Sequence, residues 1–324
     1  MLGTDYPSEI YLPQEGDCHF LFDDVRESLM QSDLTFGNLE GTFAGTHGRA
    51  KQCRHCFAFR MPVHYAQCLA GAGFDFVSLA NNHALDFGME GYYNTLQVLN
   101  NLGIQGLGLK DIPAIVIQIR DIRVGFCAFC YNPLLCDFRD TEGAKKMIQS
   151  LSKKTDIVVV SFHGGAEGAD HRYVPRRTEY YLGENRGDVY SFAHAAIDAG
   201  ADCVLGHGPH VLRAVELYQN KFIAYSLGNF CTYGRFNLGQ FNSTTLVLRI
   251  TMNSHGDFIR GKIISVYQEV PGIPKIDKRK RAVTQIRNLT NRDFPGTPLE
   301  ICDNGEILKI NLDSNGAMIR SHDF

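Results

Sequence analysis

The sequence lacks several features that would place it in a specialised class of protein. No stretch approaches the roughly 20 consecutive apolar residues that a membrane-spanning helix needs. No basic segment followed by an apolar one stands at the point where the sequence starts, so we see no secretion signal there. The 32 Lys and Arg against 35 Asp and Glu give a formal net charge of −3. We therefore expect no global positive field for nucleic acid or for an anionic membrane surface.

Length and composition are those of an ordinary globular protein. The chain has 324 residues, of which 44% are hydrophobic and 21% are charged, with 32 glycines and only 11 prolines. This composition excludes a disordered chain, a collagen-like repeat and a coiled coil. At a typical domain size of roughly 150 residues, the length predicts about two domains, or one large α/β domain with an appendage.

Ten cysteines are many for this length, but a chain of 324 residues does not need a disulfide framework to fold, so the redox compartment stays open. Two pairs have CxxC spacing. Cys127 and Cys130 lie in an apolar run that predicts a buried strand, where residues three apart point to opposite faces. We expect both to be core cysteines. Cys53 and Cys56 lie in an expected loop, where they could form a local disulfide, half of a zinc site or neither.

Short apolar runs alternate with amphipathic segments along the chain, which predicts an α/β fold of layered sheets and helices. Residues 157–160 form a continuous β-branched run, typical of a central strand that is covered on both faces. After Ile250 the pattern changes to a hairpin-like stretch, a basic link at Pro271 to Arg281 and a polar tail. We therefore expect one domain at residues 1–250 and a small C-terminal appendage at 251–324. Helices are expected at 23–31, 63–72, 90–101, 142–154 and 188–199, and strands at 34–36, 76–79, 114–119, 124–129, 157–162, 203–205, 222–226 and 244–250.

Polar side chains suited to metal binding or acid–base chemistry follow four of the expected strands. Ligands of open α/β sheets bind outside the carboxyl ends of the strands, so we expect these side chains to converge. Neighbouring glycines permit tight turns and a close approach of the ligand. The four segments are residues 37–41 with Asn38 and Glu40, residues 80–83 with Asn82 and His83, residues 163–165 with His163, and residues 206–210 with His207 and His210.

Imidazole and oxygen donors of this kind suit Mn, Fe or Zn. None of the four segments contains a cysteine, which argues against a closed structural zinc site. We therefore expect a divalent metal site. A pair of ions would activate a water nucleophile and polarise a phosphoryl or carbonyl oxygen. His83, beside Asn82, is placed to protonate a leaving group.

These segments resemble the signature blocks of the CapA family, which comprises bacterial capsule and poly-γ-glutamate synthesis proteins within the calcineurin-like metallophosphoesterase superfamily. The blocks stand in the family's order and cover residues 1 to about 250. The resemblance implies an α/β fold with a metallophosphoesterase-like two-sheet β-sandwich flanked by helices, and a dinuclear metal site at the strand ends. The blocks are residues 38–40 (Asn-Leu-Glu), 79–88 (Leu-Ala-Asn-Asn-His-Ala-Leu-Asp-Phe-Gly), 163–164 (His-Gly), 206–210 (Gly-His-Gly-Pro-His) and 225–230 (Tyr-Ser-Leu-Gly-Asn-Phe).

The resemblance also implies roles for individual residues. It makes His83 the general acid and Asp86 the neighbour that orients it. Ser226 and Asn229 are implied to line the site from the last strand of the sheet. The implied metal ligands are Asn38, Glu40, Asn82, His163, His207 and His210.

Two departures from the family pattern concern the metal site. Family members usually begin with a strand ending in Gly-Asp, just before a segment like Met1-Leu2-Gly3, so we expect the first strand and its metal aspartate to be missing here. Asp17 also follows a glycine, but it stands in a loop before an expected helix, and we expect it to lie outside the site. Secondly, the family often has histidine where Gly208 stands, which leaves His210 as the expected ligand.

A glycine-rich, charged loop follows His163. Residues 164–172 and the pair Arg176-Arg177 could present backbone N–H groups and guanidinium groups to a phosphate or a carboxylate. The alternative is a solvated surface loop. His171 and Arg172 are the candidate substrate-binding residues of this loop.

Together these features predict a metal-dependent hydrolase that acts on a phosphate ester or on an envelope polyanion, in the synthesis or processing of capsule or poly-γ-glutamate. The alternative is a non-catalytic component of a capsule synthesis or export complex, which would bind the polymer in the same cleft. Fold-level analogy does not choose between them. The expected partners are the anionic substrate and the capsule synthesis machinery. The resemblance points to the bacterial cell envelope, although the sequence itself leaves a cytoplasmic location open.

Overall fold

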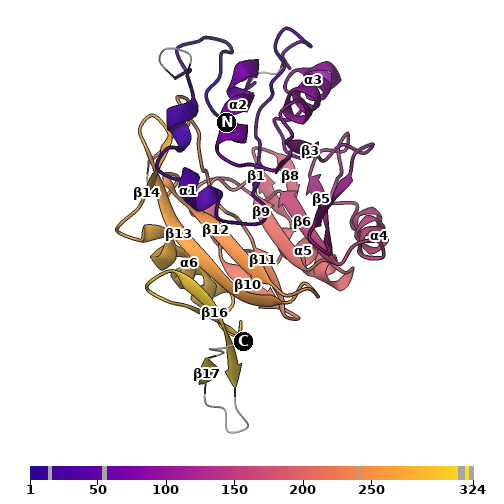
Figure 1. Ribbon diagram of the computed structural model, residues 1–324, viewed down its shortest axis with the longest axis vertical. Coiled ribbons are helices and arrows are strands. Elements are labelled where there is room, and N and C mark those ends of the chain that lie inside the picture. The colour runs from indigo at the N-terminus through magenta and orange to yellow at the C-terminus, as the bar shows by residue number, and fades with distance from the viewer. Residues whose placement is uncertain (14–16, 53–56, 240, 313–317, 321–324) are drawn as a thin grey trace.

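The protein is built in four layers, with two sheet layers facing each other and helices on the outside (Figure 1). The computed structural model describes residues 1–13, 17–52, 57–239, 241–312 and 318–320. The fold is α/β, as the sequence pattern predicted, and its layers are those of the sandwich that the family resemblance implied. Cys53 and Cys56 lie outside the described residues.

The first sheet has six strands in the order β10-β11-β9-β6-β5-β4. Its inner strands β5, β6, β9 and β11 are parallel, and the edge strands β10 and β4 run antiparallel to them. All seven residues of β6 are buried, as expected for a central strand covered on both faces. The strands are β4 (Ala114–Ile119), β5 (Ile122–Cys130), β6 (Ile157–His163), β9 (Cys203–His207), β10 (Val215–Tyr218) and β11 (Lys221–Ala224).

Helices α4 (Thr141–Ser152) and α5 (Val189–Asp198) cover the outer face of this sheet. Each begins at an aspartate whose side chain accepts a hydrogen bond from the backbone N–H three residues on. Such caps satisfy an N–H group that the first helical turn leaves unpaired. Asp140 and Asp188 therefore fix the start of the two helices.

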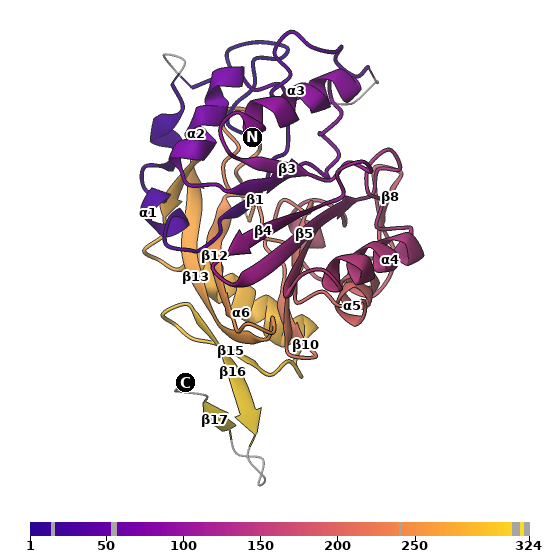
Figure 2. The ribbon, with the colours of Figure 1, turned by 45° about the vertical axis from the view of Figure 1, so that its right-hand side comes forward.

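A smaller parallel sheet forms part of the opposite layer. It has the order β1-β2-β3, with β1 (Phe36–Asn38), β2 (Phe76–Ser78) and β3 (Gln105–Leu107). Figure 2 shows α2 (Ala66–Gly71) and α3 (Gly88–Asn100) on its outer side and β4 and β5 on its inner side. The ring of Phe76 lies 3.9 Å from the ring of Phe126 in β5, measured between centroids. The core between the two layers is therefore closely packed at this point.

A third, antiparallel sheet has the order β12-β13-β16-β15, with β14 paired to β13 and β17 paired to β16. Helix α6 (Arg281–Asp293) packs against it, and the N–H of Ala282 donates to Ser265 Oγ at 2.9 Å. The expected boundary at residue 250 falls inside β12, so the division into two domains stays a prediction. The strands are β12 (Thr244–Met252), β13 (Phe258–Glu269), β14 (Ile273–Ile276), β15 (Leu299–Ile301), β16 (Glu306–Leu312) and β17 (Met318–Arg320).

The prediction of a basic link and a polar tail after Ile250 was wrong. This region instead holds α6 and five of the strands. Apolar residues recur in α6 at helical spacing, and Val283, Ile286 and Leu289 are all buried. Charged residues between them make the helix polar on average and obscured the pattern. The hairpin expected near residue 254 is confirmed by the antiparallel pairing of β12 and β13.

Most other expected elements are confirmed within a residue or two. The exception is the helix expected at 23–31, where α1 covers only Arg26–Leu29 after a 3-10 turn at His19–Phe22. Strands β3 and β10 were not anticipated. Short elements also lie at Val63–Tyr65 (η3), Ala169–His171 (η4), Glu179–Tyr181 (β7) and Glu184–Gly187 (β8).

The cysteines of the second CxxC pair are buried on opposite faces of β5, as predicted. Cys127 packs into the core under α4 and α5, and Cys130 packs into the core between the sheets. Burial raises the pKa of the Cys130 thiol to about 12. A disulfide joins Cys18 to Cys68, which ties the segment before α1 to α2.

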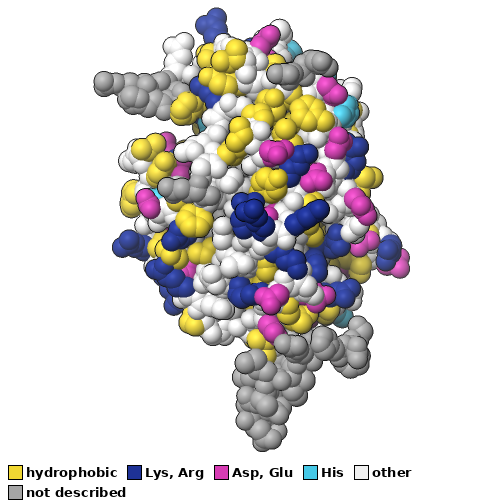
Figure 3. Space-filling model, turned by 90° about the vertical axis from the view of Figure 1, so that its left-hand side faces the viewer, with side chains coloured by type: hydrophobic (Ala, Val, Ile, Leu, Met, Phe, Trp, Pro, Cys, Tyr) yellow, Lys and Arg dark blue, Asp and Glu magenta, His cyan; other side chains and the backbone are white. Residues whose placement is uncertain are grey.

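Charges of both signs share the face over β12, β13 and β14, where lysine and arginine side chains lie among aspartates and glutamates (Figure 3). Arg249 and Lys262 stand directly opposite each other in the β12-β13 pair. Arg249 also donates to Gln31 Oε1 at 2.8 Å. Among the described helices, none combines the length and the apolar character needed to cross a membrane.

Candidate metal centre

The carboxyl ends of parallel strands bring the expected site residues to one edge of the sandwich. His163 ends β6 and His207 ends β9, and the two residues are register partners. Asn38 ends β1 on the facing sheet, and its amide nitrogen lies 3.4 Å from His163 Nδ1. Residues from both sheets therefore meet at one place, as the strand-end pattern predicted.

Glu40 is the focus of this cluster. Its Oε1 atom lies 3.9 Å from His83 Nε2, 3.8 Å from His163 Nε2 and 3.7 Å from His210 Nε2. These separations are too long for hydrogen bonds. Each of these separations is that of two ligands of one ion, because bonds of about 2.0–2.2 Å place two ligands roughly 3–4 Å apart. Among the described residues, the histidine and carboxylate donor atoms around Glu40 form no group of three that all lie within 4.8 Å of one another. Taken in pairs, Glu40 with His163 and Glu40 with His210 fit a divalent cation.

Several of the expected donor atoms are buried without a hydrogen-bond partner in the described part of the chain. All of them are potential metal ligands, and each comes from a different segment of the chain. Buried polar atoms are normally paired, because an unpaired one loses its hydration without compensation. A bound cation would satisfy Glu40 Oε1 and His163 Nε2, which lie 3.8 Å apart. The unpaired donor atoms are Glu40 Oε1, Asn82 Oδ1, His163 Nε2 and His207 Nε2.

Burial keeps two of the imidazoles neutral. It lowers the pKa of His207 to about 4, because the charged form would lose its hydration. Burial also lowers the pKa of His163 well below its usual value, and the neighbouring His210, His207 and Arg186 act in the same direction. The neutral imidazole is the form that binds a metal ion.

His83 is held by Asp86 on the side away from Glu40. The two side chains meet at 2.9 Å between His83 Nδ1 and Asp86 Oδ2. Asp86 is fully buried, and the same oxygen accepts the N–H of Phe59 at 2.7 Å, while Lys51 forms an ion pair with the other oxygen. The His83 ring also packs on the Phe59 ring, with centroids 4.5 Å apart. This fixed orientation turns His83 Nε2 towards Glu40.

His210 is aimed by its backbone and by one side chain. Its φ of 58° lies in the left-handed region that residues other than glycine rarely adopt. Its Nδ1 lies 2.7 Å from Asn229 Oδ1, which leaves Nε2 facing Glu40. Gly208 in the same turn has a φ of 116°, and a Cβ there would lie 2.7 Å from Gly164 O. A histidine at position 208, which the family often has there, would therefore not fit this turn.

Sequence reasoning missed a positioning role for Asn81. Its amide nitrogen donates to Asn38 Oδ1 at 3.2 Å and to Leu39 O at 2.9 Å. Its amide oxygen accepts the N–H of His83 at 3.0 Å. Asn81 therefore joins the β1 and β2 loops, and its place beside Asn82 in the sequence was the only available signal.

Glu167 was also missed. Its Oε2 lies 3.8 Å from His210 Nε2, and its Oε1 accepts from Arg186 Nη1 at 2.6 Å. The loop that carries it was noted in the sequence for its glycines and charges. The pattern could not tell which of its charged residues faces the cluster.

The structure does not bring all the expected residues together. Ser226 is buried, and its hydroxyl donates to Val211 O at 2.7 Å, which stabilises the turn after β9. Arg172 donates to the Tyr173 hydroxyl at 3.0 Å and lies over the Phe241 ring. His171 packs against the Tyr181 ring and accepts from Arg213 Nε through its backbone oxygen. None of these described contacts involves the cluster.

Asp17 lies in a separate group with His19 and Cys68. The sulfur of Cys68 is bonded to Cys18, so it does not offer a thiolate to a metal. No described contact joins this group to Glu40.

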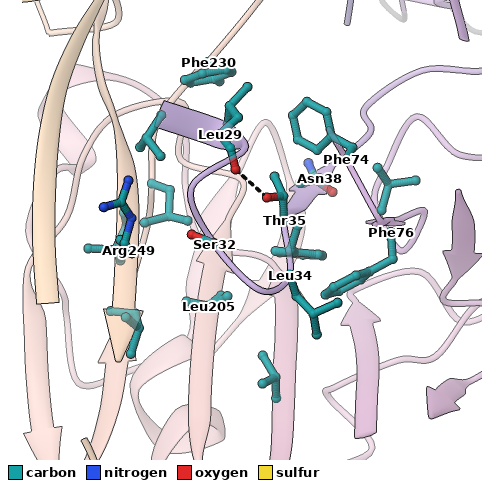
Figure 4. Close-up of a pocket in the computed structure, with 18 of the residues that line it drawn as sticks. Leu29, Ser32, Leu34, Thr35, Asn38, Phe74, Phe76, Leu205, Phe230 and Arg249 are labelled. Atoms are coloured by element: carbon teal, nitrogen blue, oxygen red, sulfur yellow. Dashed lines mark hydrogen bonds between the residues drawn. The ribbon is translucent and has the colours of Figure 1, made fainter. Parts of the chain in front are cut away.

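An apolar cavity of about 650 Å³ opens beside the cluster (Figure 4). Leu34 lines it from the segment before β1, Phe76 from β2 and Leu205 from β9, and Arg249 approaches from β12. Among the described strands, β1 and β12 are edge strands of their sheets, and both border the cavity. At its polar end the cavity is lined by Asn38, Glu40, His207, His210 and Asn229.

Fold and site thus define an α/β/β/α sandwich with a histidine- and carboxylate-rich cluster at the ends of its strands. Comparison with known families gives a direct match: residues 1–233 match the family described as "Bacterial capsule synthesis protein PGA_cap". The chain belongs to this family, and the resemblance noted in its sequence motifs is confirmed.

Two curated relatives illustrate the match. The capsule biosynthesis protein CapA of Bacillus anthracis is 30% identical over 236 residues, which is 65% of this chain and 53% of that protein. The PGA biosynthesis protein CapA of Bacillus subtilis is 29% identical over 289 residues, which is 83% of this chain and 71% of that protein. The match therefore spans only about half of the Bacillus anthracis protein.

Among solved structures, a phosphatase from Mycoplasma pneumoniae aligns over 79% of this chain and 91% of its own, with 14% identity and a TM-score of 0.49. A hypothetical protein from Thermus thermophilus aligns over 76% of this chain and 91% of its own, with 16% identity and a TM-score of 0.48.

Proposed function

We propose that this protein is a metal-dependent hydrolase that acts on a phosphate ester or on an anionic polymer of the bacterial envelope, in the synthesis or processing of capsule or polyglutamate. The observation that carries the proposal is the convergence of three imidazole nitrogens on Glu40 Oε1 at 3.7–3.9 Å. The buried donor atoms without partners support it.

The metal would be held by the strand-end residues. Ions of Mn, Fe or Zn suit this mixture of imidazole and oxygen donors. The proposed ligands are Asn38, Glu40, Asn82, His163, His207 and His210, which offer enough donors for two ions. Such ions supply a water of lowered pKa and polarise the phosphoryl or carbonyl oxygen of the substrate.

His83 would act as the general acid. Asp86 accepts from its Nδ1–H, so the protonated ring carries its second proton on Nε2, the atom that faces Glu40. That nitrogen is positioned to deliver the proton to a leaving group bound in the cluster. Asn229 plays a positioning part by holding the His210 ring. His171 and Arg172 remain proposed substrate-binding residues because of their charged, glycine-rich loop, and Ser226 remains one by the family resemblance.

The substrate class and location follow from the relatives. These relatives are named for capsule biosynthesis, for PGA biosynthesis and, in Mycobacterium tuberculosis, as a probable polyglutamine synthesis accessory protein. An envelope location suits these names, and the Cys18–Cys68 disulfide suits an oxidising compartment. We therefore place the protein in the cell envelope as part of the proposal.

The test compares His83→Ala with His255→Ala, a matched change at an exposed histidine. Metal content is measured by plasma mass spectrometry, and turnover is measured on bis-p-nitrophenyl phosphate and on poly-γ-glutamate. We expect His83→Ala to keep its metal and to lose about 10²–10⁴-fold in rate, the usual contribution of a general acid.

Other outcomes decide between the alternatives. Metal bound by the unaltered protein with no turnover on either substrate, together with binding of poly-γ-glutamate, would favour a non-catalytic polymer-binding component. Equal turnover in His83→Ala and in the unaltered protein would remove His83 from the mechanism. Protein that binds no transition metal would overturn the proposal as a whole.

A further inference from the structure

Glu167 and Glu40 each place a carboxylate oxygen within 4 Å of the same nitrogen of His210. The Oε2 atom of Glu167 lies 3.8 Å from His210 Nε2, and Glu40 Oε1 lies 3.7 Å from the same nitrogen. The separation of Glu167 Oε2 from His210 Nε2 is that of two ligands of one ion, as is the separation of Glu40 Oε1 from the same nitrogen. We propose that Glu167 is a further carboxylate ligand of the metal centre, positioned by Arg186. This inference rests on the proposed function.

Arg186 holds the Glu167 carboxylate in one orientation. Its Nη1 donates to Glu167 Oε1 at 2.6 Å, and its Nη2 pairs with Glu184 Oε2 at 3.0 Å. The guanidinium group lies 4.5 Å from the centre of the Tyr131 ring, and the side chain is 5% exposed. A buried, charge-assisted contact of this kind fixes a metal-binding carboxylate. With Oε1 held by Arg186, Oε2 faces His210.

The backbone on both sides of Glu167 is also fixed. The N–H of Ala166 donates to Glu179 Oε2 at 3.0 Å, and the N–H of Gly168 donates to Pro209 O at 2.9 Å. The second bond ties the Glu167 loop directly to the residue before His210. The two proposed ligands are therefore held next to each other before any metal binds, which reduces the entropic cost of ordering them.

Charge balance favours a second carboxylate. Glu40 is the one anionic side chain among the six ligands expected from the sequence, while two divalent ions would bring four positive charges. Uncompensated charge is costly in a largely buried site. Glu167 supplies a second negative charge beside His210.

The experiment measures binding of Mn²⁺ to chelator-stripped protein by calorimetric titration and by metal analysis after dialysis. Glu167→Gln removes the charge and keeps the shape. Glu184→Gln is the matched control, because it makes the same change at the other carboxylate that pairs with Arg186. Near-ultraviolet circular dichroism verifies that both variants are folded. We expect Glu167→Gln to weaken binding of Mn²⁺ by about 10–100-fold and Glu184→Gln to change it less than twofold.

Each remaining outcome counts against the inference in a distinct way. Affinity of Glu167→Gln within twofold of the unaltered protein would overturn the inference and leave the proposed function standing. An equal loss in Glu184→Gln would overturn it too, because the effect would then run through Arg186 alone. An unaltered protein that binds no Mn²⁺ would overturn both proposals.

Discussion

His163 and His207 are register partners at the carboxyl ends of the adjacent parallel strands β6 and β9. Neighbouring strands lie about 4.8 Å apart, so the two residues reach the same edge of the sheet side by side. Both Nε2 atoms are buried without a partner in the described residues. The sheet itself therefore fixes the spacing of these two donors, and the loops supply the others.

The Arg213–Glu179 ion pair predicts a large effect on stability. Arg213 is fully buried and contacts both carboxylate oxygens of Glu179, at 2.8 and 2.7 Å. Arg213→Met would leave the Glu179 charge buried and unpaired, which costs about 3–5 kcal/mol. Urea denaturation measures this loss. Arg120→Met, which breaks an exposed pair with Asp33, should change the free energy of unfolding by less than about 1 kcal/mol. Similar losses in both variants would contradict the prediction.

Asn229→Ala tests the positioning of His210. The variant loses the hydrogen bond to His210 Nδ1, so the ring is freer to turn away from Glu40. Loss of such a partner typically weakens metal binding by about 10–100-fold, and we expect a loss in this range for Mn²⁺, measured by calorimetric titration. Asn100→Ala, an exposed change in the last turn of α3, should leave the affinity unchanged. Unchanged affinity in Asn229→Ala would show that the ring is held by other contacts.

The disulfide predicts a stability difference that depends on reducing agent. Cys18 and Cys68 are 50 residues apart, and a crosslink over a loop of this length is worth about 4 kcal/mol by the chain-entropy relation. The double variant Cys18→Ser/Cys68→Ser should therefore unfold at lower urea concentration than the oxidised protein. Dithiothreitol should destabilise the unaltered protein and have no effect on the double variant. A double variant as stable as the oxidised protein would refute the prediction.

Metal-free protein should lose stability in mildly acidic solution. Burial lowers the pKa of His207 to about 4, against 6.5 for the free side chain. Between these values the unfolded chain binds a proton that the folded chain does not, so the free energy of unfolding falls as the pH drops from about 6.5 to 4. The loss from His207 is about 3 kcal/mol. His163, whose pKa is lowered in the same sense, adds to it.

Urea denaturation at several pH values measures this dependence. His207→Asn should reduce the slope of the unfolding free energy against pH by the amount that corresponds to about one bound proton. His255→Asn, at an exposed site, should leave the slope unchanged. An equal slope in His207→Asn and in the unaltered metal-free protein would show that another group causes the loss.

Local sequence patterns predicted most of the fold. The apolar runs at 157–160 and 244–250 are strands, and the amphipathic stretch at 188–199 is a helix, because period and burial agree there. Helix α6 was missed since its charged and polar residues together outnumber the apolar ones on which the pattern depends. Strands β3 and β10 are short, at three and four residues, and give too little pattern to recognise.

The sequence by itself determined which residues could form the site, because metal-binding side chains stand directly after strands whose ends meet at one edge. It also determined the family, since the motifs occur in order along the chain. Only the tertiary structure decided that His83, His163 and His210 converge on Glu40. It also decided that Glu167 lies beside His210 while Arg172 packs on aromatic rings. Loop residues are positioned by contacts between segments far apart in the sequence, such as the hydrogen bond between Gly168 and Pro209. Local sequence patterns do not predict such contacts.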